Sequence, residues 1–150
     1  MSASTTVRAI LGVNAAFSAL VGTDLIFMPG TISQIMFANP PHWAPMALRL
    51  LGVGLFIFAL DLVFMATNRF VTRGEIILIV LADIGWLVAS AFFLLFGGHL
   101  FTDIGILIIG IVAAFVALFA IGQYLGARKI VPPASTIRMI SPLVTKRLVA

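Results

Sequence analysis

The chain has 150 residues, of which 62% are hydrophobic and 9% charged, and its formal net charge is +4. Soluble domains usually carry about 25% charged residues, so this composition excludes an ordinary water-soluble fold and favours the lipid bilayer as solvent. The chain contains no cysteine, which excludes disulfides, thiolate catalysis, Fe–S clusters and cysteine-ligated zinc.

Four apolar segments are each long enough to cross a hydrocarbon core of roughly 30 Å. The first has neither the basic start nor the cleavage site of a signal peptide, so we expect it to be retained as a helix. Thr102 is a predicted N-cap for the last segment. Short connections make neighbouring helices antiparallel. The sequence therefore predicts an all-α, integral membrane, antiparallel four-transmembrane-helix bundle, with a domain at residues 1–126 and spans at about 7–28, 45–66, 75–96 and 102–126.

The segment at residues 31–37 lies between the first two spans and is too short to cross a membrane. Gly30, Asn39 and Pro40 bracket it with residues that break helices. We expect an interfacial turn of helix or a re-entrant piece. Trp43 follows it, at a position that fits an aromatic belt at headgroup depth.

Basic residues are distributed unevenly between the two sides of the predicted bundle. The loops at residues 29–44 and 97–102 contain no Lys or Arg. All but one of the basic residues fall on the other side: Arg8, Arg69, Arg73, Arg128, Lys129, Arg138, Lys146 and Arg147. The positive-inside rule therefore predicts a multi-pass protein of the cell membrane with N and C termini cytoplasmic.

Residues 127–150 form a predicted basic cytoplasmic tail, which argues against a nucleic-acid groove as the reason for the positive charge. Pro132, Pro133 and Pro142 prevent one long helix there. Two arrangements remain open for the tail: contact with the anionic inner leaflet, or partial disorder.

Polar residues inside the predicted spans form two layers. Asp24 and Arg49 each lie about 6 Å below the outer boundary, at a rise of about 1.5 Å per residue, and are a candidate outer ion pair between the first two helices. Asp61 and Asp83 reach depths of roughly 12 and 15 Å from the opposite side, and Asn14 comes to a similar level.

Asn14, Asp61 and Asp83 are therefore a candidate buried polar site, which Trp86 and Ser90 join on the helical face of Asp83. Two close carboxylates would share a proton and could bind a cation or carry protons. The structural alternative is that these groups only hold helices together by hydrogen bonds.

The sequence offers no catalytic, metal or cofactor set. His42 and His99 lack a third metal ligand, and no phosphate-binding loop, nucleophile elbow or HExxH helix is present. Small residues in the spans permit close helix contact and self-association. They occur at Gly12, Ala15, Ala16, Ala19, Gly52, Gly54, Ala82, Gly85 and Ala89.

Two stretches carry a resemblance to a known family. They are Ala47-Leu48-Arg49-Leu50-Leu51-Gly52-Val53-Gly54, and Ala82-Asp83-Ile84-Gly85-Trp86-Leu87-Val88-Ala89-Ser90. With the four-span layout over residues 7–126, they resemble small bacterial membrane proteins of the broad DoxX-like type. The resemblance implies a four-helix bundle in a bacterial inner membrane and brings no catalytic residues. Small multidrug transporters are similar in size and span number, but they carry a Glu in the first span, where this chain has Asn14.

These observations favour a small non-enzymatic integral membrane protein, either an accessory subunit or a binder of an apolar ligand. The expected partners are the lipid bilayer and a second copy or a larger membrane protein, and no nucleic acid or cofactor is expected. The alternative is an oligomeric proton-coupled small-molecule transporter or channel that uses Asp61 and Asp83. An enzyme is not favoured, because the sequence shows neither a nucleophile nor a metal set.

Overall fold

A computed structural model describes residues 3–67 and 72–128, and within these ranges every long element is a helix. Four of the helices are long enough and apolar enough to cross a membrane. The prediction of an all-α chain with four such helices is confirmed for the described part. The elements are α1 (Ala3–Phe27), α2 (Pro29–Met36), α3 (Ala44–Thr67), α4 (Arg73–Gly97), the 3-10 turn η1 (Gly98–Leu100) and α5 (Asp103–Ala127).

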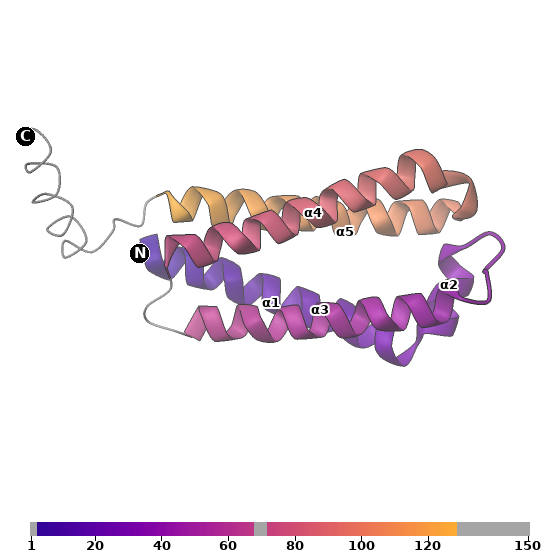
Figure 1. The fold of residues 1–150 in the computed structure, drawn as a ribbon, viewed down its shortest axis with the longest axis horizontal. Helices are drawn as coiled ribbons and strands as arrows, with labels where there is room; N and C mark the ends of the chain where they lie inside the picture. Colours follow the sequence, from indigo (N-terminus) through magenta and orange to yellow (C-terminus); the bar gives the residue numbers. More distant parts are fainter. Residues whose placement is uncertain (1–2, 68–71, 129–150) are drawn as a thin grey trace, which may run out of the picture.

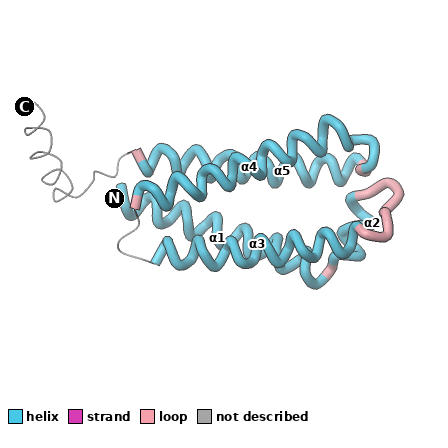
Figure 2. Tube along the Cα trace, in the orientation of Figure 1, coloured by secondary structure: helices cyan, strands magenta, loops and turns pink. Residues whose placement is uncertain are grey.

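The long helices form two pairs, α1 with α3 and α4 with α5, which lie one above the other in Figure 1. The chain reverses direction between successive long helices, as the tube in Figure 2 also shows. One end of the bundle holds the start of α1 and the end of α5, and we call it the Arg8 end. The other holds α2 and η1, and we call it the α2 end.

The helix α1 lies very close to α3 where Gly22 faces Gly52. A Cβ atom added at Gly52 would lie 2.7 Å from the carbonyl oxygen of Gly22 and 2.8 Å from the Cβ of Leu25. Such distances are too short for a real side chain, so only glycine allows the two backbones to approach this closely. This crossing makes α1 and α3 one compact unit.

At the Arg8 end the two pairs are joined by an apolar cluster that includes Val7, Leu11, Leu62 and Ile76. Within the first pair, the guanidinium of Arg8 on α1 donates to the last carbonyls of α3, with 2.6 Å from Nε to the oxygen of Ala66. A cation at a helix C-terminus offsets the negative end of the helix dipole.

At the α2 end, Thr102 ties α2 to the start of α5. Its hydroxyl donates to the carbonyl of Ile35 over 2.6 Å and accepts from the amide of Gly105, and its own amide donates to the carbonyl of Met36. Thr102 is therefore the N-cap of α5, as predicted. Phe37 and Phe101 form an isolated antiparallel bridge beside it. The two helix pairs are thus connected at both ends of the bundle.

Candidate functional site

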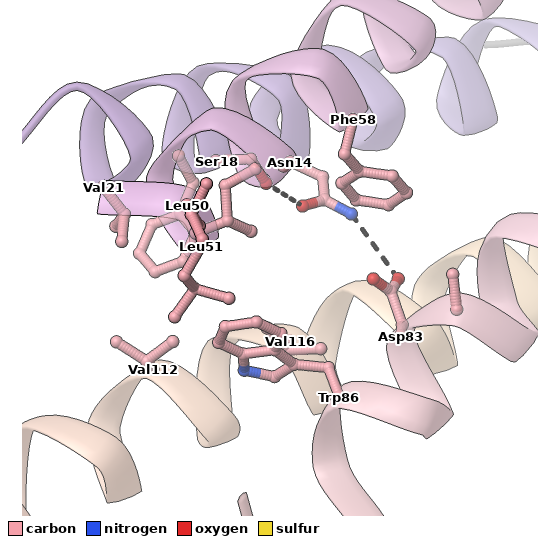
Figure 3. Close-up of a pocket in the computed structure, with 14 residues that line it drawn as sticks. Asn14, Ser18, Val21, Leu50, Leu51, Phe58, Asp83, Trp86, Val112 and Val116 are labelled. Carbon is pink, nitrogen blue, oxygen red and sulfur yellow. Dashed lines mark hydrogen bonds between the residues drawn. The ribbon is translucent and has the colours of Figure 1, made fainter. Parts of the chain in front are cut away.

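A cavity of about 330 Å³ lies between the two helix pairs, in the middle of the bundle. All four long helices contribute to its wall, and most of the wall is apolar. Figure 3 shows the side chains that line it. They are Asn14, Phe17, Ser18 and Val21 of α1, Leu50, Leu51, Gly54, Leu55 and Phe58 of α3, Ala82, Asp83 and Trp86 of α4, and Val112 and Val116 of α5.

One corner of the cavity is polar and is built by three buried side chains. Ser18 donates from its hydroxyl to the side-chain oxygen of Asn14 over 3.2 Å, and Asn14 donates from Nδ2 to Oδ2 of Asp83 over 3.5 Å. Asp83 is only 3% exposed and Asn14 only 1%. The second contact joins α1 to α4 and so connects the two helix pairs across the cavity (Figure 3).

Trp86 lies one turn from Asp83 on α4, and its ring extends into the cavity opposite Leu51 (Figure 3). The indole nitrogen Nε1 is buried and has no hydrogen-bond partner among the described residues. A buried N–H group without a partner costs free energy. Because Nε1 has almost no accessible surface, Trp86 presents its ring to the cavity rather than its donor.

The cavity opens towards the outside between α3 and α4. The lining residues Leu50, Leu51 and Gly54 of α3 and Ala82 of α4 are exposed, whereas Val116 of α5 is buried. The side of the bundle between these two helices is therefore the entrance, and its rim is apolar.

The structure brings together part of the predicted inner layer. Asn14 and Asp83 meet, Trp86 lines the same cavity, and Ser90 is buried further along the same face of α4 without lining the cavity. The predicted face of α4 is therefore an interior face in the structure.

The position of Asp61 differs from the predicted shared site. Asp61 is exposed and does not line the cavity. Phe58 is the last residue of α3 that lines the cavity, and Asp61 lies three residues closer to the Arg8 end, or about 4.5 Å further along the helix axis. No contact between the carboxyl groups of Asp61 and Asp83 is present, and the geometry for a shared proton is not formed.

The predicted outer pair also does not meet. Asp24 and Arg49 are both exposed, and neither takes part in an ion pair within the described ranges. Asp24 follows Gly22, which faces α3, by two residues, and two residues turn an α-helix by about 200°, which directs Asp24 away from α3. Level along the helices could be judged from the sequence, but orientation around them could not.

The remaining predicted features lie outside the cavity or outside the described residues. His42 and His99 are exposed, and no group of three His, Cys, Asp or Glu side chains within residues 3–67 and 72–128 could hold a metal ion. The predicted tail, apart from Ala127 and Arg128, lies beyond the described residues, as does Arg69 in the loop between α3 and α4.

Sequence reasoning missed several residues of the interior. Ser18 supports Asn14 from the next turn of α1, and its i+4 spacing was a usable signal. Gln123 of α5 is completely buried, and its amide has no hydrogen-bond partner in the part of the chain that the structure describes. A side-chain amide in so apolar a span could have been predicted as an interior group in the same way as Asp83, from its depth within the predicted span.

Gln123 lies nearer the Arg8 end than the cavity does. Its neighbour Gly122 faces Ile10, and Gly126 faces Val7. Gln123 therefore lies at the level of residues about four to seven positions before Asn14, or roughly 6–10 Å along the helix axis. It does not line the cavity.

No family model matches the sequence, and the comparisons with curated proteins and with solved structures find no similar protein. The features of the molecule that bear on its function are therefore the cavity and its polar corner.

Proposed function

We propose that the chain is a multi-pass membrane protein whose Arg8 end faces the cytoplasm, with both termini on that side, as in a bacterial inner membrane. Four apolar helices of spanning length support this proposal. Their outer faces carry large exposed apolar side chains such as Leu20, Leu78 and Leu118, as lipid contact requires. The uneven distribution of Lys and Arg gives the direction.

Within the membrane, the protein binds a small, largely apolar molecule in the cavity between the helix pairs. One observation carries this function: Asp83, an ionisable residue that is 3% exposed, is part of the wall of an otherwise apolar cavity. Ligand sites are typically concave and apolar, with a few polar groups that fix orientation, and have volumes of about 300–1,000 Å³. Ionisable residues within membrane spans are costly and usually mark functional sites.

A purely structural role explains these features less well. A carboxyl group placed only to join helices would be expected to have close hydrogen bonds, but Asn14 is 3.5 Å away. A bound molecule would offset the cost of the buried carboxyl group, which helix packing alone does not.

The alternative function, a proton-coupled transporter or channel, now depends on Asp83 alone, since Asp61 lies outside the cavity. An accessory subunit that passes the ligand to a larger membrane partner, or a homo-oligomer, is compatible with ligand binding. Flux across proteoliposomes distinguishes transport from binding, because a binder shows saturable occupancy without net movement of the ligand.

Ligand binding can be tested by a substitution that fills part of the cavity at its rim. Gly54 lines the cavity, and a Cβ atom there would meet no atom within 4 Å, so Gly54→Leu adds bulk at the entrance without a clash at the backbone. Gly110 of α5 is equally exposed and open but lies elsewhere. Gly110→Leu is therefore the matched control.

Full-length protein in lipid nanodiscs would be titrated with neopentylbenzene, an uncharged molecule small enough for the cavity. The chain has two tryptophans, so Trp43→Phe leaves Trp86 in the cavity wall as the single fluorescent reporter. We expect a saturable change in Trp86 emission that Gly54→Leu weakens and Gly110→Leu preserves. Equal responses of both variants would contradict the proposed function. Only the linear partitioning seen with empty nanodiscs would exclude a site for an uncharged ligand.

A further inference from the structure

We propose that the molecule bound in the cavity is a lipophilic organic cation, such as an alkyl- or arylammonium compound. This inference rests on the proposed ligand-binding function and deepens it by assigning the ligand a charge. Three features of the cavity carry it: an unpaired carboxyl group, aromatic faces, and an apolar entrance from the membrane.

The wall of the cavity contains an acidic side chain but no basic side chain. No Lys, Arg or His is among the residues that line it, and Asp83 forms no ion pair within the described ranges. Its polar neighbours Asn14 and Ser18 carry no charge. Asn14 donates one long hydrogen bond to the carboxyl group, and the hydroxyl of Ser18 donates to Asn14 instead. A buried carboxylate is costly unless a positive charge lies near it. A cationic ligand would supply the missing charge.

Aromatic rings face the same space from three helices. Phe17 of α1, Phe58 of α3 and Trp86 of α4 all line the cavity, and Figure 3 shows Phe58 close to Asn14 and Trp86 below the open volume. A cation over an aromatic face is stabilised by about 0.5–2 kcal/mol, and rings arranged around one volume are the usual means of recognising quaternary ammonium groups. An ammonium group bound in the cavity would therefore have both the carboxyl group of Asp83 and aromatic side chains in the wall around it.

A bare metal ion fits this cavity poorly. Hard cations such as Ca²⁺ require about six oxygen ligands or more, whereas the side chains of Asp83, Asn14 and Ser18 together hold about four oxygen atoms. The remaining wall is hydrocarbon and aromatic. It accommodates an apolar body attached to the cation, and it offers nothing to replace an ion's hydration shell.

The entrance is also consistent with an amphiphilic cation. The exposed lining residues Leu50, Gly54 and Ala82 place the opening on the side of the bundle, between α3 and α4. A lipophilic cation concentrates in the membrane and could enter there with its apolar part against these residues. Strongly hydrated ions are excluded from such a route.

The test compares two ligands of the same shape that differ only in charge. Benzyltrimethylammonium and neopentylbenzene share a phenyl ring and a branched head, but only the first is cationic. Binding to full-length protein in nanodiscs would be followed through Trp86 in the Trp43→Phe background, after subtraction of partitioning into empty nanodiscs. We expect the cation to bind at least about tenfold more tightly than the neutral molecule.

Asp83→Asn removes the charge while it keeps the size of the side chain, and we expect the ratio of the two affinities to fall towards one. Asp83→Glu should retain the preference for the cation. Asp61→Asn is the matched control, because it removes a carboxyl group at the same level of the bundle but outside the cavity. Thermal unfolding of each variant establishes that it is folded.

The outcomes separate the two proposals. Saturable binding of neopentylbenzene together with weaker binding of the cation would overturn the cationic ligand and leave the apolar binding site intact. Failure of both molecules to bind would overturn the proposed function as well. A preference for the cation that Asp83→Asn leaves unchanged, or that Asp61→Asn abolishes, would show that Asp83 is not the recognising group.

Discussion

The side-chain amide of Asn14 donates to the carboxyl group of Asp83 across 3.5 Å and thereby links α1 to α4. The two residues are 69 positions apart in the chain, and each lies on a different helix pair. The contact crosses the central cavity, so it is part of both the fold and the candidate site.

Replacing Asn14 by Leu should destabilise the protein, because Asp83 then remains buried without its amide donor. Side-chain hydrogen bonds between membrane helices have coupling free energies of about 0.6 kcal/mol on average and about 1.7 kcal/mol at most. We expect a double-mutant cycle of Asn14→Leu and Asp83→Leu, measured by detergent-induced unfolding, to give a coupling in this range. A coupling of zero would mean that the two groups do not interact.

Substitution of Gly52 should disrupt the crossing of α1 and α3. In Gly52→Ala the new methyl group would meet the backbone of Gly22 and Ile26, which cannot move aside as a flexible side chain could. We expect a loss of about 1–3 kcal/mol in the free energy of unfolding. Gly54→Ala, two residues further along the same helix, meets nothing and should be neutral or slightly stabilising. Equal stabilities of the two variants would contradict the close approach of the helices.

Thr102 should be sensitive to loss of its hydroxyl, which both caps α5 and binds α2. Thr102→Val keeps the shape but removes the donor to Ile35 and the acceptor for Gly105. Loss of an N-cap costs about 0.5–2 kcal/mol. We expect the free energy of unfolding of Thr102→Val to fall by this amount, and hydrogen exchange at the amide of Gly105 to become faster. Thr102→Ser keeps the hydroxyl and should restore slow exchange; exchange that stays slow in Thr102→Val would refute the capping role.

The orientation in the membrane can be tested by single cysteines, because the chain has none of its own. His99 at the α2 end and Gly74 at the Arg8 end are both exposed, and a Cβ atom at Gly74 would meet only the side chain of Thr72, at 3.9 Å. In intact bacterial cells, a membrane-impermeant maleimide should label His99→Cys and should label Gly74→Cys only after permeabilisation. The reverse pattern would place the Arg8 end outside and overturn the proposed topology.

Much of the candidate site could be anticipated from the sequence because depth along a helix depends only on residue count. The level of Asn14 and Asp83, and the shared face of Asp83 and Trp86, follow from a rise of about 1.5 Å and a turn of about 100° per residue. The same arithmetic cannot say which side of a helix faces its neighbour when the helix is apolar all around. Asp61 has the right level, but it is exposed and does not line the cavity.

The sequence by itself determined that four helices form, where they begin and end within a few residues, and which end of the bundle carries the basic residues. Hydrophobic length and charge placement act locally, so they can be read without knowledge of packing. Only the tertiary structure decided which helices pair and which polar groups meet. That choice depends on the fit between surfaces that are distant in the chain, as where Gly22 packs against Gly52. The packing of the two helix pairs against each other likewise brings Asn14 of α1 to Asp83 of α4 beside the cavity.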